Sequence, residues 1–168
     1  STAASELAKA LAAAGSQVLL IDGDLATPGL DGQWPLQGPG LAEAIGSETA
    51  LPGKPVALPG LHLLPAGQLH ALPARLLGDP GLPELLQQWR DSYDYVVVDS
   101  PALAEAEDGL ALLRRADRCL LVVRSDHSRM NDLREALQRW QVAGWPPFTL
   151  LFNHSEARRA TKAFRYDG

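Results

Sequence analysis

Two apolar stretches that run into an aspartate decide the fold class: VLLIDGD at residues 18–24 and YVVVDSP at residues 95–101. A short, continuous apolar run is typical of a parallel strand that is buried on both faces of its sheet. A carboxylate at the end of such a strand, Asp22 or Asp99, is costly to bury unless something compensates it. A magnesium ion near phosphates is one compensator. The two stretches therefore indicate an α/β domain with a nucleotide-phosphate site.

The same aspartates also have a plainer interpretation, in which each one caps a neighbouring helix or terminates its strand. Two such strands in one chain favour the phosphate site, because ligands of open α/β sheets bind at the carboxyl ends of the strands. Several polar residues fall at or just beyond the predicted strand ends: Asp22, Asp24, Asp99, Ser125 and Asn153.

The remaining apolar patterns predict strands and helices in alternation. Further strands are expected at 61–64, 119–123 and 148–152, and helices at about 3–14, 41–45, 74–77, 83–90, 103–115 and 129–142. Residues 26–40 and 50–60 are rich in Pro and Gly and are expected to form loops. Such an alternation implies a mainly parallel sheet that is covered by helices on both faces.

Composition narrows the class of protein further. The 168 residues are 46% hydrophobic and 21% charged, which suits one globular domain. The formal net charge of −5 gives no general reason to expect nucleic acid or anionic lipid as a partner. Cys119 is the single cysteine, so a disulfide framework and a Cys-rich metal site are excluded. No apolar run approaches the roughly 20 residues that a membrane-spanning helix needs.

Several motifs resemble those of one family. VLLIDGDLATPGL at 18–30 is similar to the second Walker-type motif of the ParA/MinD-like P-loop ATPases, in the form found in the bacterial tyrosine kinases (BY-kinases) of capsule and exopolysaccharide synthesis. YDYVVVDSP at 93–101 resembles their Walker B strand. Further motifs occur in matching order: GPGLAEAI at 38–45, LHLLPAG at 61–67, LPELL at 82–86, ADRCLLVV at 116–123 and LLFN at 150–153. The resemblance implies a three-layer P-loop NTPase-type α/β fold.

The start of the chain resembles the residues that follow the Gly-Lys of a P-loop, where a hydroxyl residue and a helix begin. By this resemblance, residues 1–168 form a single P-loop NTPase-like domain without its N-terminal strand and without the Gly-rich and Lys part of the phosphate loop. We expect that these parts precede Ser1 in the whole protein. The alternative is that the protein has lost them.

The resemblance also implies a site for ATP and Mg²⁺. Ser1 is expected to ligate Mg²⁺, and Thr2 is expected to contact phosphate. Asp99 is expected to hold Mg²⁺ through water, as a Walker B aspartate does. Asp22 and Asp24 are expected to assist the metal and to orient or deprotonate the attacking hydroxyl.

Two residues of the C-terminal part complete the expected site. By the resemblance, Asn153 would contact the adenine; its plainer interpretation, a polar strand terminus, weighs about equally. Tyr166 is the candidate phosphoacceptor, because BY-kinases usually end in a cluster of tyrosines that are phosphorylated between subunits. The tail from 158 to 168 offers this one tyrosine.

The chain also departs from the BY-kinase pattern. Ala26 stands where an Arg or Lys is common, Arg75 replaces an expected Glu, and Ala102 stands where a second proline usually follows the Walker B strand. Three functions therefore stay open. The first is an ATP-dependent BY-kinase-like protein of capsule or exopolysaccharide synthesis. The second is a MinD/ParA-like ATPase that regulates a secretion or polymer machine. The third is a catalytically degenerate docking or regulatory domain of the same fold.

The first function implies partners and a location. A membrane polysaccharide co-polymerase, or an equivalent activator, is the expected partner, and the chain is expected to self-associate. The expected location is cytoplasmic. Attachment to the inner face of the cell membrane, through a partner or a fused membrane segment, would suit the same function.

Overall fold

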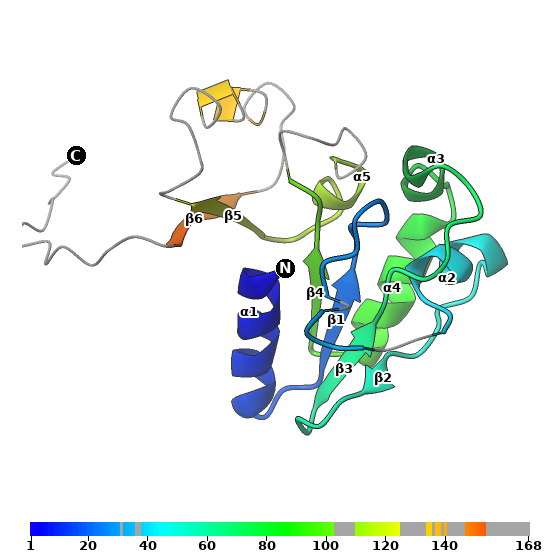
Figure 1. Cartoon of the computed structure of the whole chain (residues 1–168), viewed down its shortest axis with the longest axis horizontal. Helices are drawn as coiled ribbons and strands as arrows, with labels where there is room; N and C mark the ends of the chain where they lie inside the picture. Colours follow the sequence, from blue (N-terminus) through cyan, green and yellow to red (C-terminus); the bar gives the residue numbers. More distant parts are fainter. Residues whose placement is uncertain are drawn as a thin grey trace, which may run out of the picture. The chain divides into compact units, whose positions relative to one another are not determined.

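The computed structural model describes residues 1–30, 32–35, 38–102, 110–124, 134–135, 137–138, 140 and 147–153. The chain forms two compact units, residues 1–116 and 117–168 (Figure 1). The prediction that both belong to a single domain stays a prediction.

The first unit contains a four-stranded sheet with the order β2-β3-β1-β4. Strand β1 (Val18–Asp22) pairs in parallel with β3 (Leu61–Leu64) on one side and with β4 (Tyr95–Asp99) on the other. The short strand β2 (Lys54–Pro55) pairs antiparallel with β3. The sheet is therefore mainly parallel, as the alternation of strands and helices predicted.

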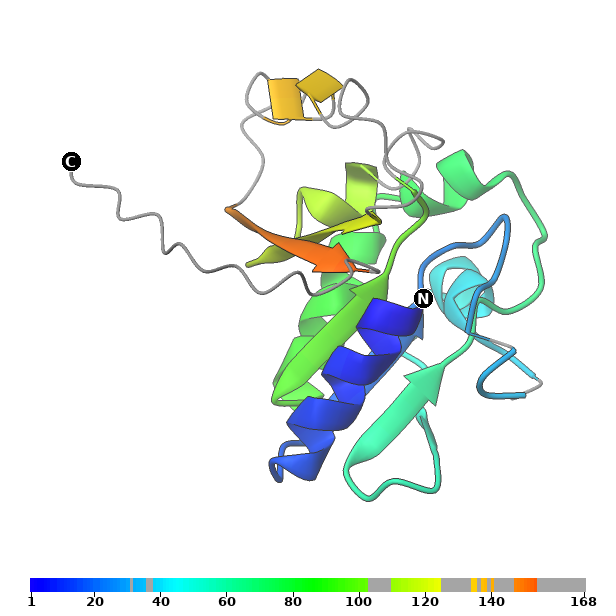
Figure 2. The same ribbon diagram turned by 60° about the vertical axis from the view of Figure 1, so that its left-hand side comes forward.

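Helices cover both faces of this sheet. Helix α1 lies on one face, and α2, α3 and α4 lie on the other, so that the first unit has three layers (Figures 1 and 2). The helices of the first unit are α1 (Thr2–Ala13), α2 (Leu41–Ser47), α3 (Pro73–Leu77), α4 (Leu82–Ser92) and α5 (Leu110–Leu113).

Strand β1 contributes to both cores of the first unit, and all five of its residues are buried. Leu19 and Ile21 pack in the core with α2, α3 and α4, whereas Val18 and Leu20 pack in the core with α1. Burying one such side chain contributes about 1.5–3 kcal/mol, so both faces stabilise the strand. This two-sided burial is the physical reason for the continuous apolar run in the sequence.

Helix α4 shows how the local sequence sets an element. Leu82, Leu85 and Trp89 form its buried stripe, and Pro83 lies in the first turn, where a missing N–H leaves no hydrogen bond broken. The indole Nε1–H of Trp89 donates to the carbonyl oxygen of Leu51 at 2.9 Å. The largest side chain of this core therefore keeps its one polar atom satisfied.

In the second unit, β5 (Cys119–Arg124) and β6 (Phe148–Asn153) pair in parallel. Cys119 is buried, and burial raises the pKa of its thiol. A raised pKa disfavours the reactive thiolate, which suits a cysteine of the core.

The structure bears out most of the elements expected from the sequence, with ends that move by one or two residues. It differs at β2, because residues 50–60 were expected to form a loop throughout. Pro55 lacks a backbone N–H and is tolerated because β2 lies at the edge of the sheet. Of the helices expected at 103–115 and 129–142, large parts lie outside the described residues. Within the described residues, no helix is long and apolar enough to cross a bilayer.

Candidate active site

The aspartates that end β1 and β4 lie side by side. The parallel register pairs Asp22 with Asp99, and both side chains are buried. The N–H of Gly23 donates to the carbonyl oxygen of Asp99 at 2.7 Å. A Cβ on Gly23 would lie 2.7 Å from that same oxygen, so only glycine allows the two strand ends to approach this closely.

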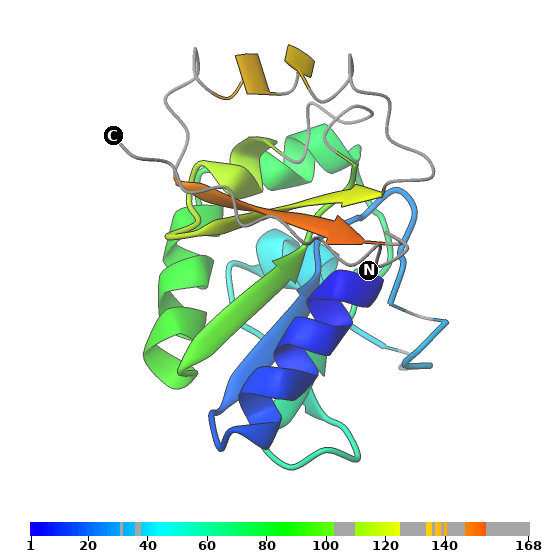
Figure 3. The ribbon, with the colours of Figure 1, turned by 90° about the vertical axis from the view of Figure 1, so that its left-hand side faces the viewer.

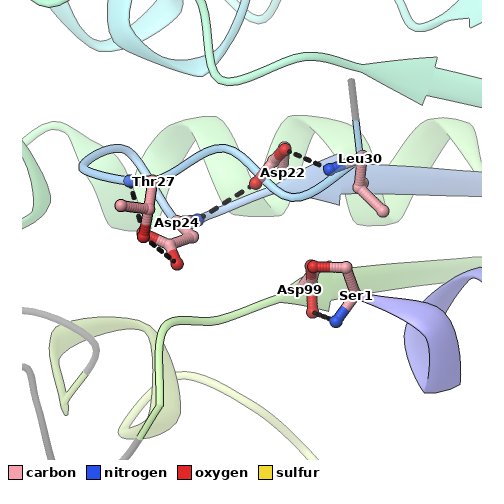
Figure 4. A network of polar contacts seen from close by, with 6 residues as sticks. All are labelled: Ser1, Asp22, Asp24, Thr27, Leu30 and Asp99. Carbon is pink, nitrogen blue, oxygen red and sulfur yellow. Dashed lines mark hydrogen bonds and ion pairs between the residues drawn. The ribbon is translucent and has the colours of Figure 1, made fainter. Parts of the chain in front are cut away.

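The residue that precedes α1, Ser1, lies at the same strand ends. Figure 3 shows α1 along the sheet, with its N-terminal end near the arrowheads of β1 and β4. The backbone nitrogen of Ser1 lies 3.2 Å from Oδ1 of Asp99 (Figure 4). The structure therefore brings together Ser1 and Asp99, the two residues expected to hold Mg²⁺.

The loop after β1 is organised by hydrogen bonds to Asp22 and Asp24. Oδ2 of the fully buried Asp22 accepts the N–H of Leu30 at 3.1 Å, and Oδ1 accepts the N–H of Asp24 at 3.2 Å. Asp24 in turn accepts the N–H of Thr27 at 3.0 Å and its hydroxyl at 2.9 Å (Figure 4). Asp22 is thus held inside the loop, while the half-buried Asp24 lies nearer to solvent.

The donor set suits one magnesium ion with a single carboxylate. Within the described part of the chain, no group of three or more His, Cys, Asp or Glu side chains is placed to hold a metal ion. Mg²⁺ is usually bound by one or two carboxylates together with phosphates and waters. The Ser1 hydroxyl and the Asp99 carboxylate fit that pattern, because both residues carry oxygen atoms and lie at the carboxyl ends of β1 and β4.

The other expected site residues lie elsewhere. Thr2 is the first residue of α1 and is exposed. Asn153 ends β6 in the second unit and keeps both of its interpretations. Tyr166 lies outside the described residues.

A second carboxylate junction, which was not predicted from the sequence, lies after β3. Glu43 of α2 accepts the N–H of Gly40 at 2.7 Å and the N–H of Gln68 at 2.9 Å. Burial alone would raise the pKa of Glu43, but these backbone hydrogen bonds outweigh it and lower the pKa overall. The Gly-x-x-Glu spacing of a capping box could have predicted the hydrogen bond from Gly40 to Glu43. No pattern in the sequence indicates the hydrogen bond from Gln68 to Glu43.

Comparison with known proteins places this geometry in a family. The tyrosine-protein kinase ptk of Acinetobacter johnsonii is 30% identical over 141 residues, which cover 82% of this chain and 19% of ptk. ExoP of Rhizobium meliloti, a succinoglycan biosynthesis transport protein, is 32% identical over 172 residues, which cover 98% of this chain and 22% of ExoP. The kinase domain of the Escherichia coli tyrosine kinase ETK matches with a TM-score of 0.84 and 26% identity, over 97% of this chain and 65% of that domain. The homologues of this chain are bacterial tyrosine kinases.

A cell division ATPase shares the fold of this chain. The cell division ATPase MinD of Pyrococcus furiosus matches with a TM-score of 0.72 and 22% identity, over 93% of this chain and 67% of MinD, which shows the shared fold alone. No protein-family model matches the chain. The chain spans about a fifth of the length of ptk and of ExoP.

Proposed function

We propose that this chain is the nucleotide-binding part of an ATP-dependent BY-kinase of capsule or exopolysaccharide synthesis, which transfers a phosphoryl group from Mg-ATP to tyrosine. The observation that carries the proposal is the pairing of the buried Asp22 and Asp99 at the carboxyl ends of β1 and β4, where Ser1 also lies. The names of the homologues support the reaction and the pathway: ptk is a tyrosine-protein kinase, and ExoP serves succinoglycan biosynthesis.

The bound Mg²⁺ would neutralise charge on the phosphate oxygens. Ser1 and Asp99 would hold it. Asp24, the less buried carboxylate of the β1 loop, would orient the tyrosine hydroxyl and accept its proton, while Asp22 keeps the loop in shape through its two backbone hydrogen bonds. Phosphoryl transfer needs mainly positioning and charge neutralisation, so these few groups are sufficient for the chemistry.

The remaining residues complete the proposal. Thr2 would contact phosphate, and Asn153 would contact the adenine. Tyr166 would accept the phosphoryl group, in a neighbouring copy of the chain or alongside a tyrosine of a partner. That partner would be a membrane polysaccharide co-polymerase, which places the kinase at the inner face of the cell membrane.

The nucleotide part is tested by calorimetric titration of the full-length protein, as encoded, with Mg-ATP and with ATP in excess EDTA. We expect micromolar binding that requires Mg²⁺. Absence of binding to a protein with an intact phosphate loop would overturn the proposal.

The kinase part is tested by mass spectrometry after incubation with Mg-ATP. We expect phosphotyrosine, with loss of signal at position 166 in Tyr166→Phe. ATP hydrolysis without any phosphotyrosine would instead favour a MinD/ParA-like ATPase. The shared MinD fold and the single tyrosine of the tail are the observations behind that second candidate.

A further inference from the structure

We propose that Gly29 is a positioning residue for the metal site, because its missing side chain leaves the space that the Ser1 hydroxyl occupies beside Asp99. The inference rests on the proposed function. It identifies the residue of the β1 loop that sets the affinity of the site for Mg²⁺.

The geometry around Gly29 leaves no room for a methyl group. A Cβ built on Gly29 would overlap Oγ of Ser1, would lie 3.0 Å from Cβ of Ser1, and would lie 3.8 Å from Oδ2 of Asp99. The φ angle of Gly29 is not in the positive range that favours glycine, so the backbone conformation there also suits alanine. The obstacle to a side chain at this position is therefore the Ser1 side chain itself.

The loop cannot easily move away from Ser1. The next residue, Leu30, donates its N–H to the buried Asp22 and inserts its side chain, 1% exposed, into the core with α1. Breaking a buried hydrogen bond of this kind costs about 1–3 kcal/mol. Turning the Ser1 side chain to another staggered rotamer changes one torsion and removes the overlap with Oγ at a lower cost. The remaining distance of 3.0 Å between the two Cβ atoms then needs a shift of Ser1 by a few tenths of an ångström. Ser1 is therefore the group that yields.

A substitution at Gly29 thus acts on the metal ligands and leaves the fold intact. When the Ser1 hydroxyl turns away from Asp99, the site loses the hydroxyl ligand proposed for Mg²⁺. The affinity for Mg²⁺ falls, while the binding of nucleotide without metal stays unchanged.

The chain offers a matched control in the same loop. A Cβ on Gly32 meets nothing within 4 Å, and Gly32 likewise lacks a positive φ. Gly29→Ala and Gly32→Ala therefore add the same methyl group, in one case against Ser1 and in the other into open space.

The experiment titrates Mg²⁺ at a fixed concentration of a fluorescent ATP analogue, using the full-length protein. We expect the half-saturating Mg²⁺ concentration to rise about 10-fold or more in Gly29→Ala, as for loss of a metal-orienting contact, and to stay within about twofold in Gly32→Ala. Ser1→Ala should match Gly29→Ala, and the double variant should add little, because both substitutions remove the same ligand.

A metal-free readout accompanies the titration. In the protein without nucleotide or Mg²⁺, the ¹³Cβ chemical shift of Ser1 should change in Gly29→Ala and stay constant in Gly32→Ala, with all melting temperatures close to wild type. Wild-type Mg²⁺ dependence in Gly29→Ala would overturn the inference and leave the proposed function standing. A large drop of its melting temperature would also overturn it, because the loop would then be yielding instead of Ser1. Failure of the wild-type protein to bind Mg-ATP would overturn both.

Discussion

The loops after β1 and after β3 are both held by a carboxylate that accepts two backbone N–H groups. In the β1 loop the carboxylate is Asp22, which is fully buried; in the β3 loop it is Glu43, which is half-buried. The β1 loop also carries Asp24, and its first residue, Gly23, bonds to Asp99 at the end of β4. The β3 loop has no counterpart of these among its described contacts. The same arrangement of a carboxylate and two backbone N–H groups therefore holds both loops. The additional carboxylates near the β1 loop are the reason that we propose the chemistry there.

The largest effect is expected at Asp22. Asparagine keeps one acceptor oxygen but turns an NH₂ group toward a backbone N–H, which leaves buried donors unsatisfied. We expect Asp22→Asn to lower the free energy of unfolding by about 3 kcal/mol, measured by urea denaturation. If Asp22→Asn lowered the free energy of unfolding no more than Glu43→Gln does, the burial of the carboxylate would not decide how much each junction stabilises the fold.

The next effect concerns chemistry. Asp99→Asn should weaken Mg-ATP binding by about 100-fold, because Asp99 is the carboxylate proposed to hold Mg²⁺ through water, and loss of such an outer-shell partner costs about 10- to 100-fold. Calorimetry with and without Mg²⁺ measures the change. Glu43→Gln is the control and should bind Mg-ATP like wild type. Equal losses in both variants would show that the β3 junction belongs to the site.

A smaller loss of stability is expected at the β3 junction. Glu43→Gln leaves one of the two backbone N–H groups facing an NH₂ group, but water reaches this half-buried position. We expect the free energy of unfolding to fall by about 1 kcal/mol. Glu48→Gln, at the exposed end of the same helix, should change it by less than about 0.5 kcal/mol.

The smallest effect is the dependence on pH. Folding lowers the pKa of Glu43 from its ordinary value of 4.5, so the carboxylate stabilises the native state above that pH. The advantage of wild type over Glu43→Gln should be full near pH 7 and should shrink as the pH falls below 4.5 through the folded pKa. Urea titrations of both proteins across this range give the difference. A gap that grows toward low pH would contradict the assignment.

The comparison also shows how far the sequence could predict this molecule. The strands β1 and β4 were both predicted from a continuous apolar run that ends in an aspartate. Burial on both faces explains that run in β1, whereas in β4 the three valines are only half-buried and Tyr95 is exposed. The contacts of Glu43 with Gln68, and of Gly29 with Ser1, join segments that are distant in sequence. No periodicity encodes such contacts, because they depend on which strands become neighbours.

The same limit applies to the edge of the sheet. Strand β2 is two residues long and contains Pro55, so its sequence is typical of a loop, and its pairing with His62 depends on β3 lying beside it. The resemblance to BY-kinases supplied the roles of Ser1 and Asp99. The structure then added their proximity, which the motifs alone do not contain.

The central position of β1 has a consequence for how the chain folds. Val18 pairs with Leu61 on one side and with Tyr95 on the other, so neither partner is near it in sequence. Two long loops must close before the middle strand gains its hydrogen bonds, and non-local pairing of this kind slows folding. Asp22 and Asp99 therefore come together late, after the strand order of the sheet has formed.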